Sequence, residues 1–196
     1  MNVVETGLRT RHGSFQIVCR DEPENGHPDF VLVMGDVRDQ RGVLTRVQSE
    51  CLTGHVFQSL TCDCNEQMQD ALARIASEGR GVLVYLRQEG RGIGLVGKLR
   101  SYILQKLGRD TVDANIELGY DVDPRTYESA AELLKHLSVA SIRLLTNNPK
   151  KASELRRLGI DVESEEQLNP VVRDENRRYL ETKVGRMGHR FSIDPK

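Results

Sequence analysis

The sequence has no apolar run of the ~20 residues that a membrane-spanning helix needs. It also lacks a basic excess, with 28 Lys and Arg against 29 Asp and Glu, so non-specific nucleic-acid binding is not indicated. Residues 1–7 lack the basic start and apolar core of a secretory signal. These absences predict a cytoplasmic, globular protein that binds neither a membrane nor nucleic acid.

Cysteine is scarce too, and in a chain without a signal the four cysteines are expected to be thiols. Cys19 lies in an alternating apolar stretch and is expected to pack within a strand. Cys51, Cys62 and Cys64 have the spacing C-x10-C-x-C. Three thiolates suit one zinc ion and leave its fourth position open, which is typical of a zinc that activates water. A structural zinc closed by His55, or buried thiols without a metal, are the alternatives.

The order of the expected elements favours an α/β fold. Strands are expected at 14–19, 30–34, 42–47, 81–86, 142–145 and 160–162, and helices at 66–77, 98–107, 127–137 and 149–158. This alternation predicts a three-layer single domain whose mixed β-sheet is flanked by helices, with antiparallel N-terminal strands. We expect a catalytic domain at 1–168 and a C-terminal tail at 169–196 that forms a terminal helix or orders over the active site.

A glycine-rich loop, residues 87–94, follows one of the expected strands. Glycine lets a backbone approach a ligand closely, and Arg91 offers a planar fork for phosphate. Glu89 can accept two hydrogen bonds from a guanine edge. The spacing matches neither a P-loop nor a dinucleotide fingerprint, so an ordinary loop is the alternative.

Two further stretches carry polar residues. Thr146 and Lys151 lie where a strand ends and a helix begins, and helix N-termini favour phosphate. The alternative is an ordinary helix cap with surface lysines. Asp123 and Arg125 flank a proline and can hold a water and a phosphate, although by themselves they favour a surface ion pair of little energetic value.

Taken in order, five stretches closely resemble the GTP cyclohydrolase II family, and the similarity covers nearly the whole chain, including residues 183–189. The stretches are Arg46-Val-Gln-Ser-Glu-Cys-Leu-Thr-Gly54, Cys62-Asp-Cys64, Arg87-Gln-Glu-Gly-Arg-Gly-Ile-Gly-Leu95, Asp110-Thr-Val-Asp-Ala-Asn115 and Leu144-Leu-Thr-Asn-Asn-Pro-Lys-Lys151. Several long motifs in a fixed order make a chance match improbable.

The resemblance implies a zinc hydrolase that converts GTP to 2,5-diamino-6-ribosylamino-4(3H)-pyrimidinone 5′-phosphate, formate and pyrophosphate, the first step of riboflavin synthesis. It implies one zinc ion per chain, magnesium on the triphosphate and a homodimer. Its zinc ligands are Cys51, Cys62 and Cys64. Its catalytic positions are Asp123 as proton acceptor, Arg125 as nucleophile and Tyr102 as an active-site tyrosine. Its GTP-binding positions are Arg46, Val47, Gln48, Ser49, Glu50, Gln67, Glu89, Gly90, Arg91, Thr111, Thr146 and Lys151.

The chemistry of the residues agrees with this family. Opening an imidazole ring requires water at C8 and then hydrolysis of a formamide, and a zinc-bound hydroxide can perform both steps. Arg125 is protonated throughout the working range, so a charge clamp is as compatible with the sequence as a nucleophile.

Two departures from the family leave alternatives open. Gln48 stands where a histidine is common, and residues 163–173 replace a proline-rich apolar segment. A paralogue with truncated chemistry, giving a formamidopyrimidine nucleotide, is therefore the second hypothesis. A zinc-stabilised module that binds nucleic acid or protein is the third, and the near-neutral charge and the missing fourth Cys/His pair argue against it.

Overall fold

The structure is a computed structural model that describes residues 2–21, 27–121 and 123–193. The chain forms two compact units, each assembled from three segments. The first unit comprises Met1–Gln48, Met68–Arg87 and Tyr127–Leu168, and the second comprises Ser49–Gln67, Gln88–Thr126 and Asn169–Lys196. The chain leaves the first unit for the last time after Leu168.

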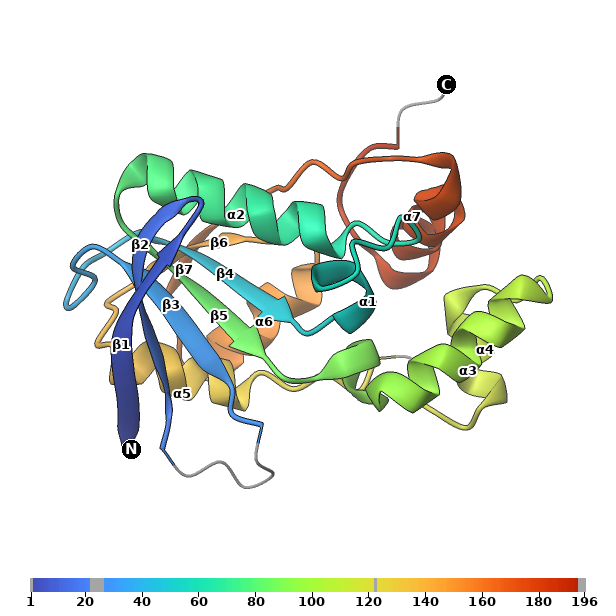
Figure 1. Ribbon diagram of the computed structural model, residues 1–196, viewed down its shortest axis with the longest axis horizontal. Helices are drawn as coiled ribbons and strands as arrows, with labels where there is room; N and C mark the ends of the chain where they lie inside the picture. The colour runs from blue at the N-terminus through green and yellow to red at the C-terminus, as the bar shows by residue number, and fades with distance from the viewer. Residues whose placement is uncertain (1, 22–26, 122, 194–196) are drawn as a thin grey trace. The chain divides into compact units, whose positions relative to one another are not determined.

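A seven-stranded sheet dominates the first unit, in the order β1-β2-β3-β5-β4-β6-β7 (Figure 1). The strands are β1 (Val3–Thr10), β2 (Gly13–Arg20), β3 (Phe30–Met34), β4 (Val43–Ser49), β5 (Gly81–Leu86), β6 (Ile142–Leu145) and β7 (Val162–Glu166). The pairs β1–β2, β2–β3 and β3–β5 are antiparallel, whereas β4–β6 and β6–β7 are parallel. The predicted mixed sheet with antiparallel N-terminal strands is thus confirmed.

Alternating side chains divide the core of the first unit between the two faces of the sheet, as the two-residue period of a strand requires. On one face, Val31 and Val84 pack with Leu133 of α5 (Glu128–His136) and with α6 (Pro149–Arg157). On the other face, Leu32 packs with Ile75 of α2 (Cys64–Glu78). Figure 1 shows α2 on one side of the sheet and α5 and α6 on the other. The three-layer α/β fold is confirmed.

Both outer strands differ from the expectation. Strand β1 was not expected because it is exposed along most of its length and has no apolar face; its pairing with β2 holds it in place. Strand β7 begins at Val162, not at residue 160, because the Ile160 N–H bonds to the Leu155 carbonyl and closes α6. After Val162, β7 consists of polar and charged residues. An edge strand tolerates them because its alternate side chains are exposed to solvent.

The second unit is mainly helical. Its elements are α1 (Leu52–His55), a 3-10 turn η1 (Glu89–Gly92), α3 (Gly94–Lys106), α4 (Thr111–Glu117) and α7 (Asp174–Met187), together with the first residues of α2. Helix α3 begins four residues before the expected start at residue 98. Helix α4 was not expected, although Asp110 caps it by accepting the N–H groups of Val112 and Asp113. The tail contains a helix, as one of the two expectations stated. Among the described helices, none has the length and apolar character needed to span a membrane.

Candidate functional site

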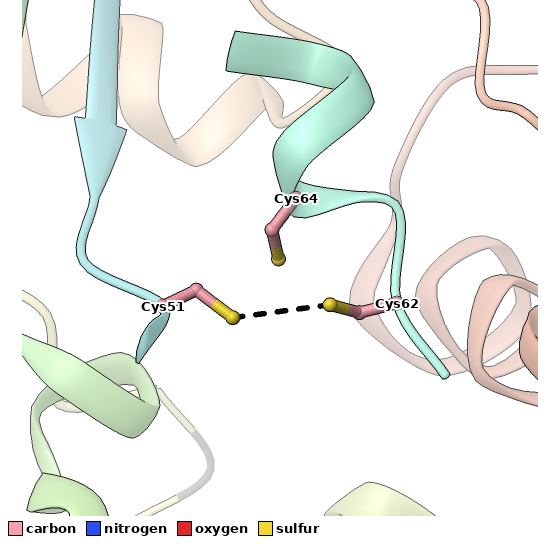
Figure 2. A group of neighbouring side chains, drawn as sticks. All are labelled: Cys51, Cys62 and Cys64. Atoms are coloured by element: carbon pink, nitrogen blue, oxygen red, sulfur yellow. Dashed lines mark hydrogen bonds between the residues drawn. The ribbon is translucent and has the colours of Figure 1, made fainter. Parts of the chain in front are cut away.

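Three cysteine side chains of the second unit converge on one point. Figure 2 shows the sulfur atoms of Cys51, Cys62 and Cys64 directed toward one another. The Cys51 and Cys62 sulfurs are 3.8 Å apart, and all three lie within 4.8 Å of one another. A tetrahedral zinc with Zn–S bonds of ~2.3 Å places its sulfurs about 3.8 Å apart. The cluster therefore fits one zinc ion without rearrangement of the backbone.

Local structure brings these sulfurs together. Cys51 ends the segment after β4 and caps α1, where its sulfur accepts the Gly54 N–H at 3.3 Å. Cys64 is the first residue of α2, and Cys62 precedes it by two positions. Gly54 lies against the cluster: a Cβ there would be 3.0 Å from the Cys62 sulfur and 3.1 Å from the Cys51 sulfur. A side chain at residue 54 would therefore crowd the sulfurs, and the glycine lets them approach one another.

Gly54→Ala is expected to weaken zinc binding by about tenfold or more, because the added methyl displaces two sulfur ligands. Chelator competition against the wild-type protein measures this change. Gly185→Ala is the matched control, since no atom lies within 4 Å of a Cβ at that position of α7. Equal zinc affinity for Gly54→Ala and the wild type would contradict the proposed position of the metal.

The closed site with His55 as a fourth ligand is not what the geometry favours. The cluster of candidate metal ligands found among the described residues consists of the three cysteines and does not include His55. The His55 Nδ1 instead accepts the Cys51 N–H at 3.3 Å. This hydrogen bond directs the imidazole to the backbone of α1.

The three thiols titrate as one group. The Cys62 and Cys64 thiols donate to Cys51, and Lys98 lies beside it, so the pKa of Cys51 is held far below its usual value. Donation to Cys51 raises the pKa of both Cys62 and Cys64, and burial raises each further. Because thiolates are the form that binds a metal, metal binding releases the protons that these thiols carry.

A buried lysine, Lys98 of α3, joins the cysteines to the glycine-rich loop. Its Nζ lies 3.0 Å from the Cys51 sulfur and 2.9 Å from Glu89 Oε1. The other oxygen of Glu89 accepts the Leu52 N–H at 2.5 Å, and Oε1 also accepts the Gly90 N–H. Burial alone would lower the pKa of Lys98, but the charges of Cys51 and Tyr102 and the hydrogen bonds to Cys51 and Glu89 together raise it. Lys98 is therefore a fixed cation between a metal ligand and the predicted guanine-binding carboxylate.

The predicted active-site tyrosine, Tyr102, lies on the same face of α3, one turn after Lys98. Its hydroxyl is 3.3 Å from Thr53 Oγ1, which lies 3.6 Å from the Cys51 sulfur. Burial raises the pKa of Tyr102, so the phenol keeps its proton near neutral pH. The hydroxyl can therefore donate a hydrogen bond beside the cysteine cluster.

The loop at residues 88–94 packs against the segment that carries the predicted catalytic pair. Gln88 links the two, because its side chain accepts the Thr126 N–H and donates to Ser49. Gly90 and Arg91 have φ values of +62° and +64°, which glycine adopts freely and arginine rarely. Strain of this kind persists where the surroundings fix the backbone, and it is common at ligand sites.

Asp123 and Arg125 form a bidentate ion pair with two N–O distances of 2.6 Å. Both side chains are nearly buried, which excludes the exposed surface pair considered above. Burial would raise the pKa of Asp123, but the hydrogen bonds and charge of Arg125 outweigh it and lower the pKa. Asp123 is thus ionised and a weak base, and the geometry shows it orienting the Arg125 guanidinium.

Four other predicted positions also belong to the second unit. Gln67 donates to Asp63 at 2.5 Å, and Ser49 accepts from Gln88. Thr111 is the first residue of α4, and Glu50 is partly buried beside Cys51.

The remaining predicted positions belong to the first unit, at the ends of β4 and β6 and the start of α6. Buried Arg46 donates to Gln48 Oε1 and to the Leu145 carbonyl, both at 2.9 Å. Lys151 is also buried and donates to the Val47 carbonyl at 2.5 Å. The alternative of two surface lysines on α6 therefore holds for Lys150, which is exposed, and is wrong for Lys151.

Lys98 and Asp63 contribute to the site but were not predicted. Lys98 lies near the start of an expected helix, where a lysine normally faces solvent. Its position one turn before Tyr102 could have indicated a place at the site, because residues four apart share a helix face. In the sequence, Asp63 is a polar residue between two cysteines, as is common in a loop. Its role depends on Lys183, which is distant in the chain and contacts it only in the fold.

Comparisons with known proteins agree with the sequence motifs. The family described as GTP cyclohydrolase II matches residues 1–167. A GTP cyclohydrolase-2 of Pseudomonas paraeruginosa is 48% identical over 187 residues, which cover 95% of this chain and 91% of the relative. That of Yersinia pseudotuberculosis is 47% identical, covering 95% of each chain. The riboflavin biosynthesis protein RibBA of Salinispora tropica is 51% identical over 95% of this chain and 47% of its own length.

Proposed function

The chain belongs to the GTP cyclohydrolase II family, hydrolases of riboflavin biosynthesis, and from this premise we propose that it catalyses the full reaction on GTP. The products are 2,5-diamino-6-ribosylamino-4(3H)-pyrimidinone 5′-phosphate, formate and pyrophosphate. The observation that supports this proposal most directly is the convergence of three sulfurs beside the Lys98–Glu89 pair. It combines a metal position with a carboxylate suited to guanine.

Zinc is the metal that the donor set fits best, because thiolate is a soft ligand and the sulfur spacing is tetrahedral. When bound, zinc supplies a Lewis acid and activates water for attack on C8 of the purine. Cys51, Cys62 and Cys64 would hold it. Tyr102, with its proton retained, is placed to donate a hydrogen bond near that position.

Glu89, Gly90 and Arg91 are proposed to bind the nucleotide. A carboxylate has about four acceptor positions, and Glu89 uses three of them inside the protein, so it can accept one further donor from guanine. Gly90 has no Cβ, and one built there would lie 3.0 Å from Ile93 Cγ1 and 3.1 Å from Lys98 Cβ, so glycine lets the loop pack closely beside Lys98. Arg91 provides the guanidinium that a phosphate requires.

Arg125 is proposed to act as a clamp on the phosphate that is cleaved. Its guanidinium is permanently protonated and oriented by Asp123 through two hydrogen bonds. A cation fixed in this way stabilises charge that develops during displacement of pyrophosphate. Asp123, whose pKa is lowered, serves first to hold Arg125 and accepts a proton only weakly.

The other positions that the resemblance assigns to GTP are proposed as nucleotide ligands on that basis. Within the first unit, buried Arg46 donates to the Leu145 carbonyl and buried Lys151 donates to the Val47 carbonyl. Magnesium is proposed to accompany the triphosphate, as the resemblance implies. Gln48 accepts from Arg46, so this departure from the usual histidine keeps a polar contact.

Product analysis tests the reaction. Zinc-loaded protein incubated with GTP and Mg²⁺ is expected to release formate and pyrophosphate in equal amounts, and the nucleotide product is expected to lack the formyl carbon. Mass spectrometry separates this product from a formamidopyrimidine, which retains that carbon. A retained formyl group would support the truncated reaction instead, and release of neither product would exclude both.

We also propose a homodimer, the assembly that the resemblance implies. Helix α3 and its C-terminal cap residue carry exposed apolar side chains, Val96, Leu99, Ile103 and Leu107, which a partner would cover. Light scattering measures the mass directly, and a value that corresponds to a single 22.1 kDa chain would contradict a dimer.

A further inference from the structure

The C-terminal helix α7 contacts the cysteine cluster through a buried ion pair. Lys183 of α7 donates to Asp63 Oδ1 at 2.7 Å. Asp63 lies between Cys62 and Cys64 in the chain, and its side chain is 0% exposed, against 8% for that of Lys183. A carboxylate buried this completely requires a charged partner, and Lys183 is the cation that the fold supplies.

Other contacts within the second unit fix both members of this pair. Gln67 donates to the second oxygen of Asp63 at 2.5 Å, so the carboxylate is held at both ends. The Lys183 ammonium lies 4.5 Å from the centre of the Tyr179 ring, within range of a cation–π interaction. Arg173, which immediately precedes α7, pairs with Glu66 in the first turn of α2 at 2.5 Å. The helix is thus joined to the segment of the cysteines at two charged contacts.

The same helix also contacts Arg91 in the glycine-rich loop. The Arg91 guanidinium lies 5.6 Å from the centre of the Tyr179 ring and donates to the Met187 sulfur at 3.0 Å. Tyr179 therefore lies between the cation that holds Asp63 and the cation proposed to bind nucleotide. These contacts explain how Arg91 is kept in a backbone conformation that arginine rarely adopts.

We infer that α7 is a positioning element of the metal centre and that Lys183 is its positioning residue. By fixing Asp63, Lys183 sets the directions of the two flanking cysteine side chains, much as partners outside the ligand shell orient ligands in other metal sites. The inference rests on the proposed function only in taking the three cysteines as metal ligands. It concerns a helix that lies beyond residue 167, the last residue that the family model matches.

Lys183→Met tests this role by removing the charge while keeping an unbranched apolar stem. The variant is expected to bind Zn²⁺ and Co²⁺ about 10–100-fold more weakly than the wild type in chelator competition. The visible spectrum of its Co²⁺ form is expected to change, because that spectrum reports the geometry of the sulfur ligands. Arg186→Met is the matched control: Arg186 is also a cation of α7 with acidic partners, but these are Asp110, which caps α4, and Asp113 within α4.

A double variant, Asp63→Asn with Lys183→Met, covers the case in which an unpaired buried carboxylate prevents folding. With both charges removed, the protein is expected to fold and to regain thermal stability, yet to bind metal at least about tenfold more weakly than the wild type. Wild-type metal affinity and an unchanged Co²⁺ spectrum in the double variant would overturn the inference and leave the pair as a fold determinant only.

Parallel assays separate this inference from the proposed function. Wild-type protein that binds metal but releases no formate from GTP would refute the reaction and leave the positioning role intact. Wild-type protein that releases formate, alongside a folded Lys183→Met variant with unchanged metal binding, would refute the positioning role alone.

Discussion

Cys62→Ser is expected to abolish formate release from GTP, with a loss of at least about 10³-fold, because a metal bound by three thiolates cannot be held by two at the same affinity. The Cys62 sulfur lies 3.8 Å from that of Cys51, so its removal opens one side of the cluster. Zinc content measured after dialysis is expected to fall with the activity. Part of the pyrophosphate release is expected to remain, since Arg125 and its partner Asp123 do not contact the sulfurs through any of the hydrogen bonds described above.

Cys19→Ser is the matched control for this prediction. Cys19 is a partly buried thiol in β2 of the first unit, and its replacement is expected to leave zinc content and formate release unchanged. Full formate release by Cys62→Ser would show that the sulfur cluster is not the centre that opens the ring. Equal loss of formate and pyrophosphate would show that the metal also takes part in the phosphate chemistry.

Lys98→Met is expected to lower kcat/KM for GTP by about 10²–10³-fold, although Lys98 belongs to none of the motifs from which the function was predicted. The substitution removes the donor to the Cys51 sulfur and to Glu89, so both the metal ligand and the guanine-binding carboxylate lose their fixed position. Zinc affinity is expected to fall about 10–100-fold. Stopped-assay kinetics and chelator competition measure the two effects separately.

The control for Lys98 is Lys106→Met, which changes an exposed lysine near the end of the same helix. Lys98→Arg keeps the charge and is expected to retain more activity than Lys98→Met, because a guanidinium can still donate to sulfur and carboxylate. Unchanged zinc affinity and unchanged kinetics in folded Lys98→Met would contradict a role for this lysine at the site.

Much of the fold could be predicted from the sequence because its core strands are short apolar runs and its main helices repeat apolar residues at helical spacing. The strands at 30–34, 81–86 and 142–145 have the predicted bounds, and each is buried on both faces of the sheet. Strand β1 could not be predicted in this way, because its position depends on pairing with β2 and not on an apolar face. Strand β7 was expected to end at residue 162, because the residues that follow are charged; some of these side chains pair with arginines, as Glu166 does with Arg143.

The candidate site shows the same division between local and long-range information. The spacing of Cys51, Cys62 and Cys64 is a local pattern, and the structure brings these residues together as predicted. Lys183 lies 120 positions from Asp63 in the chain, so their contact depends on the fold of the whole second unit. Supporting residues of this kind have no fixed spacing from the ligands, and sequence alone does not reveal them.

Zinc K-edge X-ray absorption on the purified protein tests the central claim most directly. The expected spectrum contains three sulfurs at ~2.3 Å and one lighter atom at ~2.0 Å, without the outer-shell scattering of an imidazole. That result would establish a metal held by Cys51, Cys62 and Cys64 with one position accessible to water. A fourth protein ligand such as His55, or a zinc ion without sulfur neighbours, would contradict the account.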